Sequence, residues 1–131
     1  MNEARLYAVE LSAGAEQDLD DIVVHVATQD SPRKASALLD RLLAAAETLA
    51  TAPLRGSVPR ELQILGMREY RQTMFKPYRL VYRVQEEPSP KVFVVVIADG
   101  RRDMAALLQR RLLAAPPLPD ADPAGQGRWS G

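Results

Sequence analysis

Five arginines in the second half of the chain are the residues best suited to a binding or chemical role. They lie in or next to apolar stretches, and they are Arg71, Arg79, Arg83, Arg101 and Arg102. A guanidinium group makes planar, bidentate contacts with phosphate and carboxylate. We therefore predict an arginine-lined face on a small sheet that binds an anionic partner. The alternative is that a chain rich in alanine and leucine simply uses arginine as its default cation.

Charge is unevenly distributed, although the formal net charge is zero. Residues 1–30 contain seven acidic residues and one basic residue, whereas residues 55–111 contain twelve basic and six acidic residues. A basic half and an acidic half on one small domain favour one face for an anionic partner. Internal ion pairs to Asp99 or Asp103 are the competing interpretation for Arg101 and Arg102.

Few residues are suited to metal or acid–base chemistry. The chain has no cysteine and one histidine, His25, so we predict no metal site and no cofactor. We expect His25 to be a surface or boundary residue, far from the arginines and without a nucleophile beside it. Acidic residues also cluster in the first predicted helix, where a solvated face is the favoured interpretation over a metal site. They are Glu16, Asp18, Asp20 and Asp21.

The first half of the chain predicts a strand and two helices. Tyr7–Leu11 alternates apolar and polar residues, as a half-buried strand does. Ser12 is a suitable N-cap for a helix that runs to about residue 28, and Ser31-Pro32 begins a second helix that runs to about Ala50. The short connection predicts an antiparallel helical hairpin, and its apolar sides must cover a sheet.

The second half of the chain predicts that sheet. The expected strands are Glu61–Leu65, Tyr70–Phe75, Tyr78–Val84 and Val92–Ala98. Strand alternation places Arg79, Val81 and Arg83 on the face opposite the two tyrosines of the same strand. The last strand is apolar throughout, so we predict that it is central and covered on both faces. A final helix is expected from about Arg102 to Ala114, with Asp99 as a candidate cap. Arg110 and Arg111 suit the C-terminal end of that helix and need no functional role.

These elements predict an α+β fold: an N-terminal helical hairpin packed on a mainly antiparallel sheet of four to five strands, with a C-terminal helix. We expect one domain over residues 1–115. The composition of residues 116–131 predicts a disordered tail, in which Trp129 is interpreted as a chance aromatic. No apolar run is long enough to span a bilayer and no signal-peptide pattern is present, so a cytoplasmic location is expected.

The chain resembles the RelE/ParE family of small bacterial toxins from type II toxin–antitoxin systems. The resemblance spans roughly Val9 to Leu113, and the order and spacing of four stretches carry it. These are Leu11 to Ile22 with Asp18-Leu19-Asp20-Asp21-Ile22, Leu49 to Gly56, Tyr78 to Val84, and Gly100-Arg101-Arg102-Asp103 with Leu107, Leu108, Arg111 and Leu112. The family fold agrees with the layout predicted from the residues.

The resemblance implies one of two mechanisms. RelE-type toxins cut mRNA on the ribosome with basic residues and often a tyrosine in the last helix. Here Arg71, Arg79 and Arg102 match basic positions of that set. However, Thr73 replaces a second basic residue and Leu108 stands where the tyrosine would be. ParE-type toxins poison DNA gyrase, and the Arg-Asp pair followed by leucines looks more like their final helix.

We therefore favour a ParE-like inhibitor of DNA gyrase that is not an enzyme and has no catalytic residues. A RelE-like ribosome-dependent endoribonuclease is the alternative, with the ribosome and mRNA as its partners. A third hypothesis is an inert relative that only binds its partner. The resemblance implies a ParD-like antitoxin in each case. We predict that acidic groups of its C-terminal segment pair with some of the arginines and that its leucines pack along the helical hairpin.

Overall fold

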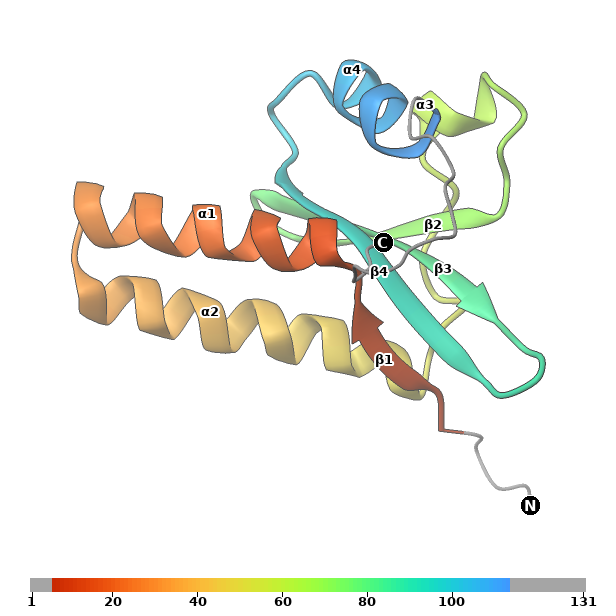
Figure 1. Ribbon diagram of the computed structural model, residues 1–131, viewed down its shortest axis with the longest axis horizontal. Helices are drawn as coiled ribbons and strands as arrows, with labels where there is room; N and C mark the ends of the chain where they lie inside the picture. Colours follow the sequence, from red (N-terminus) through yellow and green to blue (C-terminus); the bar gives the residue numbers. More distant parts are fainter. Residues whose placement is uncertain (1–5, 114–131) are drawn as a thin grey trace, which may run out of the picture.

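The computed structural model describes residues 6–113 (Figure 1). The predicted tail over 116–131, with Trp129, lies outside these residues. The elements in chain order are β1 (Ala8–Leu11), α1 (Ala13–Gln29), α2 (Pro32–Glu47), a 3-10 turn η1 (Thr48–Ala50), α3 (Arg60–Gln63), β2 (Tyr70–Phe75), β3 (Tyr78–Gln85), β4 (Lys91–Asp99), α4 (Met104–Leu108) and a π-helical turn η2 (Gln109–Leu113).

The sheet has four strands in the order β1-β4-β3-β2. β1 pairs in parallel with β4, and the other two pairings are antiparallel. β4 therefore lies inside the sheet beside β3, as its apolar sequence predicts. The predicted fold class is confirmed: the helical hairpin α1–α2 covers one face, and α3 and α4 cover the other (Figure 1).

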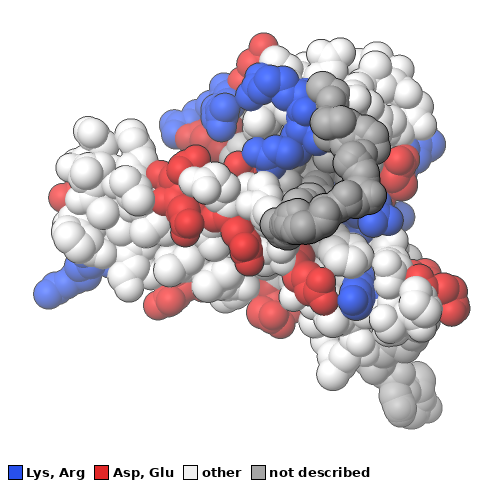
Figure 2. Space-filling model, in the orientation of Figure 1, with Lys and Arg blue, Asp and Glu red and all other residues white. Residues whose placement is uncertain are grey.

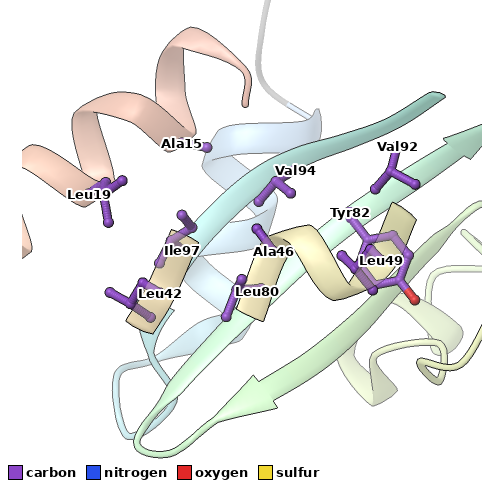
Figure 3. Close-up of a cluster of buried hydrophobic side chains, with 10 residues drawn as sticks. All are labelled: Ala15, Leu19, Leu42, Ala46, Leu49, Leu80, Tyr82, Val92, Val94 and Ile97. Carbon is purple, nitrogen blue, oxygen red and sulfur yellow. The ribbon is translucent and has the colours of Figure 1, made fainter. Parts of the chain in front are cut away.

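The helical hairpin forms where local capping signals start each helix. The Ser12 Oγ accepts a hydrogen bond from the Ala15 backbone N–H at 3.1 Å, and the Ser31 Oγ accepts one from the Lys34 N–H at 3.1 Å. Pro32 occupies the first turn of α2, where its missing N–H has no cost. Side chains from both helices pack on the sheet (Figure 3). This cluster contains Ala15, Leu19, Leu42, Ala46, Leu49, Leu80, Tyr82, Val92, Val94 and Ile97.

A second core lies on the opposite face of the sheet. It contains Leu62 of α3, Val81, Val96 and Ala98 of the sheet, and Met104, Leu107 and Leu108 of α4. Each fully buried leucine or valine contributes about 1.5–3 kcal/mol. The prediction that β4 is covered on both faces is therefore confirmed.

A β-bulge in β4 changes which residues face each core. Val81 pairs with Val96, whereas Tyr82 pairs with Val94, so Val95 has no direct partner in β3. As a result Val94 and Ile97, which are three residues apart, both face the helical hairpin. Strict alternation would have placed them on opposite faces.

Two predicted elements differ from the structure. The strand predicted at Glu61–Leu65 is wrong, since the segment contains the short helix α3. Only Leu62 is buried, while Ile64 is 79% exposed, so the apolar residues do not form a strand-like face. The predicted cap Asp99 is also wrong: the last helix begins at Met104, because the Asp103 Oδ1 accepts the Ala106 N–H at 3.1 Å.

Within residues 6–113, every helix is too short or too polar to cross a membrane.

Candidate functional site

Arg79 projects from β3 toward α3 and is fully occupied by partners from the same chain. Its Nη1 and Nη2 lie 3.0 Å and 2.9 Å from the two carboxylate oxygens of Glu61. Its Nε donates to the Gln72 Oε1 at 2.8 Å. The Arg79 side chain is only 11% exposed. The hydrogen bond from Arg79 lowers the pKa of Glu61, which keeps this carboxylate ionised.

A groove of about 750 Å³ surrounds this pair. Four cations line it, namely Arg60, Lys76, Arg79 and Arg101, against the single carboxylate of Glu61. Gly100 forms part of its wall: a Cβ atom there would lie 2.9 Å from the Arg79 Cδ and 3.2 Å from the Pro77 carbonyl oxygen. A glycine at this position therefore lets the Arg79 side chain reach Glu61.

Arg101 is exposed but paired. Its Nε and its backbone N–H both donate to the Asp99 Oδ1 at 2.9 Å. These hydrogen bonds lower the pKa of Asp99 to about 2. The structure thus supports the internal ion pair as the interpretation of Arg101. Arg102 differs, since it makes no ion pair with any residue between 6 and 113.

Arg102 lines a second cavity of about 500 Å³ together with His25, Tyr78 and Arg101. The expectation that His25 lies far from the arginines is wrong. α1 packs along β4, so the second half of the helix reaches the end of that strand. Three aspartates, Asp18, Asp21 and Asp99, also line the cavity, so its carboxylates outnumber its arginines. Burial raises the pKa of the Tyr78 hydroxyl, which stays protonated at neutral pH.

Arg71 faces away from Arg79. It lies opposite Tyr82 in the β2–β3 pairing, and paired residues project from the same side of a sheet. Its Nη1 donates to the carbonyl oxygen of Gly56 at 2.6 Å and of Leu54 at 3.3 Å. Arg71 therefore holds the loop after α2 on the face of the sheet that packs against the helical hairpin.

Arg83 is separated from the other four arginines. Its guanidinium carbon lies 5.5 Å from the centre of the Phe93 ring, a cation–π contact. The five predicted arginines therefore do not form one surface. Arg79 and Arg101 share the groove, Arg101 and Arg102 share the second cavity, and Arg71 and Arg83 lie elsewhere.

An ion pair that the sequence did not predict joins α1, near the start of the described chain, to η2 at its end. The Asp18 carboxylate contacts the Arg111 Nη2 at 2.8 Å and Nη1 at 3.1 Å. Both residues also bind the backbone of β4 at or near its bulge: the Ile97 N–H donates to Asp18 at 2.9 Å, and Arg111 donates to the Val95 carbonyl at 2.8 Å. The interpretation of Asp18 as part of a solvated face is wrong, because its side chain is 14% exposed and fully engaged.

Charge is unevenly distributed on the face of the molecule drawn in Figure 2. Figure 2 shows basic side chains over α4 and the loop that leads into it, and acidic side chains over α1. A shallow surface beside β1 combines carboxylates with apolar side chains and is lined by Val9, Glu10, Leu11, Glu16, Leu19, Asp20 and Leu43. Within residues 6–113, no three acidic, histidine or cysteine side chains are grouped as metal ligands.

Comparison with known families identifies the chain. The model of the ParE toxin of the type II toxin–antitoxin system parDE matches residues 9–104. The chain belongs to the ParE toxin family.

Solved structures agree with this ParE-family fold. A chain of the chromosomal ParDE toxin–antitoxin system from P. aeruginosa aligns with a TM-score of 0.60 and 16% identity, over 73% of this chain and 98% of that chain. A chain of the toxin–antitoxin complex RelBE2 from Mycobacterium tuberculosis aligns with a TM-score of 0.54 and 24% identity, over 76% of this chain and 97% of that chain. No curated protein matches the chain.

Proposed function

We propose that this ParE-family toxin poisons DNA gyrase in the cytoplasm by binding it, and that a cognate antitoxin neutralises it. The observation that carries the proposal is the Glu61–Arg79 pair. Cleavage of a phosphodiester needs cations that are free to stabilise charge on the phosphate, together with groups that accept and donate a proton. In this groove the least exposed cation is already neutralised by the chain's own carboxylate.

The part of the groove lining that residues 6–113 form also lacks the proton-transfer groups of a nuclease. Glu61 is the only carboxylate among the described lining residues, and its lowered pKa makes it a weak base. Leu108, where RelE-type toxins often carry a tyrosine, is 1% exposed and belongs to the core against the sheet. Thr73 pairs with Leu80 and so faces the helical hairpin rather than the groove. These features favour a binding mechanism over catalysis.

One observation favours the alternative, ribosome-dependent mRNA cleavage. The second cavity brings His25, Tyr78 and Arg102 together, and these residue types can transfer protons and bind phosphate. The three aspartates of the same cavity oppose this function, because they repel a phosphodiester. We therefore rank the endoribonuclease second.

Induction of the toxin alone in bacterial cells distinguishes the two functions. Gyrase poisoning is expected to induce the SOS response and leave transcripts intact, and purified toxin should trap gyrase–DNA cleavage complexes. Fragmented mRNA without an SOS response, abolished by His25→Ala and Arg102→Ala, would establish the endoribonuclease instead. Unimpaired growth would show an inert relative that only binds its partner.

Neutralisation by an antitoxin is supported by family membership and by the two aligned structures, each of which comes from a toxin–antitoxin system. We propose a ParD-like antitoxin as the partner. Co-expression of the adjacent open reading frame should restore growth and co-purify with the toxin. Failure of every neighbouring reading frame to do so would contradict this part of the proposal.

A further inference from the structure

The Glu61–Arg79 pair has the geometry of a carboxylate-binding site. Two parallel contacts of 2.9 Å and 3.0 Å join the guanidinium to both oxygens of one carboxylate, which is the bidentate arrangement preferred by arginine. Gln72 holds the guanidinium from the side. Glu61 reaches this site from α3, whereas Arg79 and Gln72 belong to the sheet.

The Glu61 side chain, which occupies this site, is more exposed to solvent than the Arg79 side chain that binds it. The Arg79 side chain is 11% exposed, and the Glu61 side chain is 26% exposed. Leu62, the next residue, is fully buried and anchors α3. Rotation of the Glu61 side chain can therefore carry its carboxylate into water while the backbone of α3 stays in place.

The rest of the groove carries uncompensated positive charge. Arg60 and Lys76 make no ion pair among residues 6–113. Met74, Val58 and Pro77 add an apolar surface, and Met74 is 47% exposed. A methionine side chain adapts to the shape of an incoming apolar group. The groove thus offers cations and apolar contacts along one concave surface.

We propose that Glu61 is a built-in occupant of a carboxylate site, and that an acidic segment of the neutralising antitoxin displaces it and binds Arg79 in its place. The identity of the partner rests on the proposed function. An exchange of one carboxylate for another keeps the guanidinium paired throughout, and so avoids the large cost of an unpaired charge with little access to water. Arg60 and Lys76 attract the acidic segment and speed its association.

The lining of the groove favours a protein segment over a nucleic acid. Single-stranded nucleic acids bind through aromatic side chains on which bases stack, in addition to cations. The residues between 6 and 113 that line this groove include no aromatic side chain. The present occupant, moreover, is a carboxylate with good geometry, which shows that the site accommodates this group.

Binding of an acidic peptide to the purified full-length toxin tests the proposal. The probe is a fluorescein-labelled peptide of alternating glutamate and leucine, and a single-stranded RNA of equal charge is the second ligand. Glu61→Gln removes the competing carboxylate and is expected to tighten peptide binding on the order of fivefold, as judged from the strength of partly exposed ion pairs. Arg79→Gln should abolish this gain in the double variant Glu61→Gln/Arg79→Gln.

Glu47→Gln is the matched control, because it removes one negative charge from the exposed end of α2, far from the groove. Equal gains in peptide affinity from Glu61→Gln and Glu47→Gln, or no gain in affinity from Glu61→Gln, would overturn the proposal. A gain for RNA alone would also overturn it, in favour of a nucleic-acid site. In the wild-type protein, the peptide should shift the NMR resonance of the Arg79 Nε–H, and an unchanged resonance at saturation would refute displacement.

None of these measurements includes gyrase. A toxin that binds the peptide through Arg79 but fails to trap gyrase–DNA complexes would therefore disprove the proposed target and leave the carboxylate site intact. The opposite result would retain gyrase as the target and disprove the site.

Discussion

A guanidinium with little access to water needs a fixed anionic partner, and two arginines of this toxin meet that need in different ways. Arg79 takes Glu61 from α3, and Arg111 takes Asp18 from α1. The first pair connects α3 to the sheet, and the second connects α1 to η2. Arginine in this chain thus fixes the arrangement of elements as well as supplying surface charge.

The Glu61–Arg79 pair predicts a pH dependence of stability. The pKa of Glu61 is lowered in the folded protein, so the stability that it contributes is present above the unfolded pKa, roughly 4.3. That stability is lost as the pH falls through the folded pKa. Urea unfolding from pH 6 to 3 should show a smaller loss of stability in Glu61→Gln than in wild type. Parallel curves for the two proteins would contradict this assignment.

The Asp18–Arg111 pair predicts strong coupling between α1 and the last turn of the described chain. Asp18→Asn and Arg111→Gln should each reduce the free energy of unfolding by about 2 kcal/mol, since each leaves polar groups at the β4 bulge without a partner. The double variant should lose much less free energy of unfolding than the sum of the losses in the two single variants. A double-mutant cycle from urea unfolding measures this, and additive losses would show that the two residues act independently.

Sequence separation explains which of these pairs could be predicted. Arg101 and Asp99 are two residues apart, and their internal pairing was one of two interpretations of the sequence. Asp18 and Arg111 are 93 residues apart, and they meet on β4 beside its bulge, where they bind the Ile97 N–H and the Val95 carbonyl. A bulge leaves no clear signal in an uninterrupted run of apolar residues such as β4.

At the scale of elements, local signals predicted α1, α2 and all three antiparallel strands, β2, β3 and β4, to within a few residues. Ser12, Ser31 and Pro32 act within one turn, so their effect can be read without knowledge of the fold. α3 was mistaken for a strand because a four-residue helix is too short to display a helical period. Its conformation depends on the contact of Leu62 with the core around α4.

The loop after α2 is attached to the sheet by close packing at Gly56. A Cβ atom there would lie 2.2 Å from the Gln72 carbonyl oxygen and 2.7 Å from the Tyr82 hydroxyl. Gly56→Ala should therefore destabilise the protein by about 2–3 kcal/mol, because rigid backbone must move. Thermal or urea unfolding measures the loss, with Ser57→Ala as the control on the exposed neighbouring residue. A fully stable Gly56→Ala would show that the loop is not held against β2.

At the scale of the molecule, two hydrophobic cores on opposite faces of one sheet both stabilise the fold. The core under the helical hairpin is the larger, and Leu42 of α2 is 1% exposed within it. Leu42→Ala should cost about 3 kcal/mol, as buried leucine truncations do. Leu43→Ala is the matched control, since this neighbour is 39% exposed and should cost less than about 1 kcal/mol. Equal losses of stability in Leu42→Ala and Leu43→Ala, measured by urea unfolding, would contradict the assignment of Leu42 to the core.

The parallel pairing of β1 with β4 has a consequence for how the toxin is made. The first strand of the described chain pairs only with the last one, and residues 12–90 separate them. A nascent chain released up to residue 90 has its helical hairpin but lacks the strand against which that hairpin packs. Contacts of such long range also slow folding. The sheet of the toxin is therefore complete only when synthesis has passed residue 99.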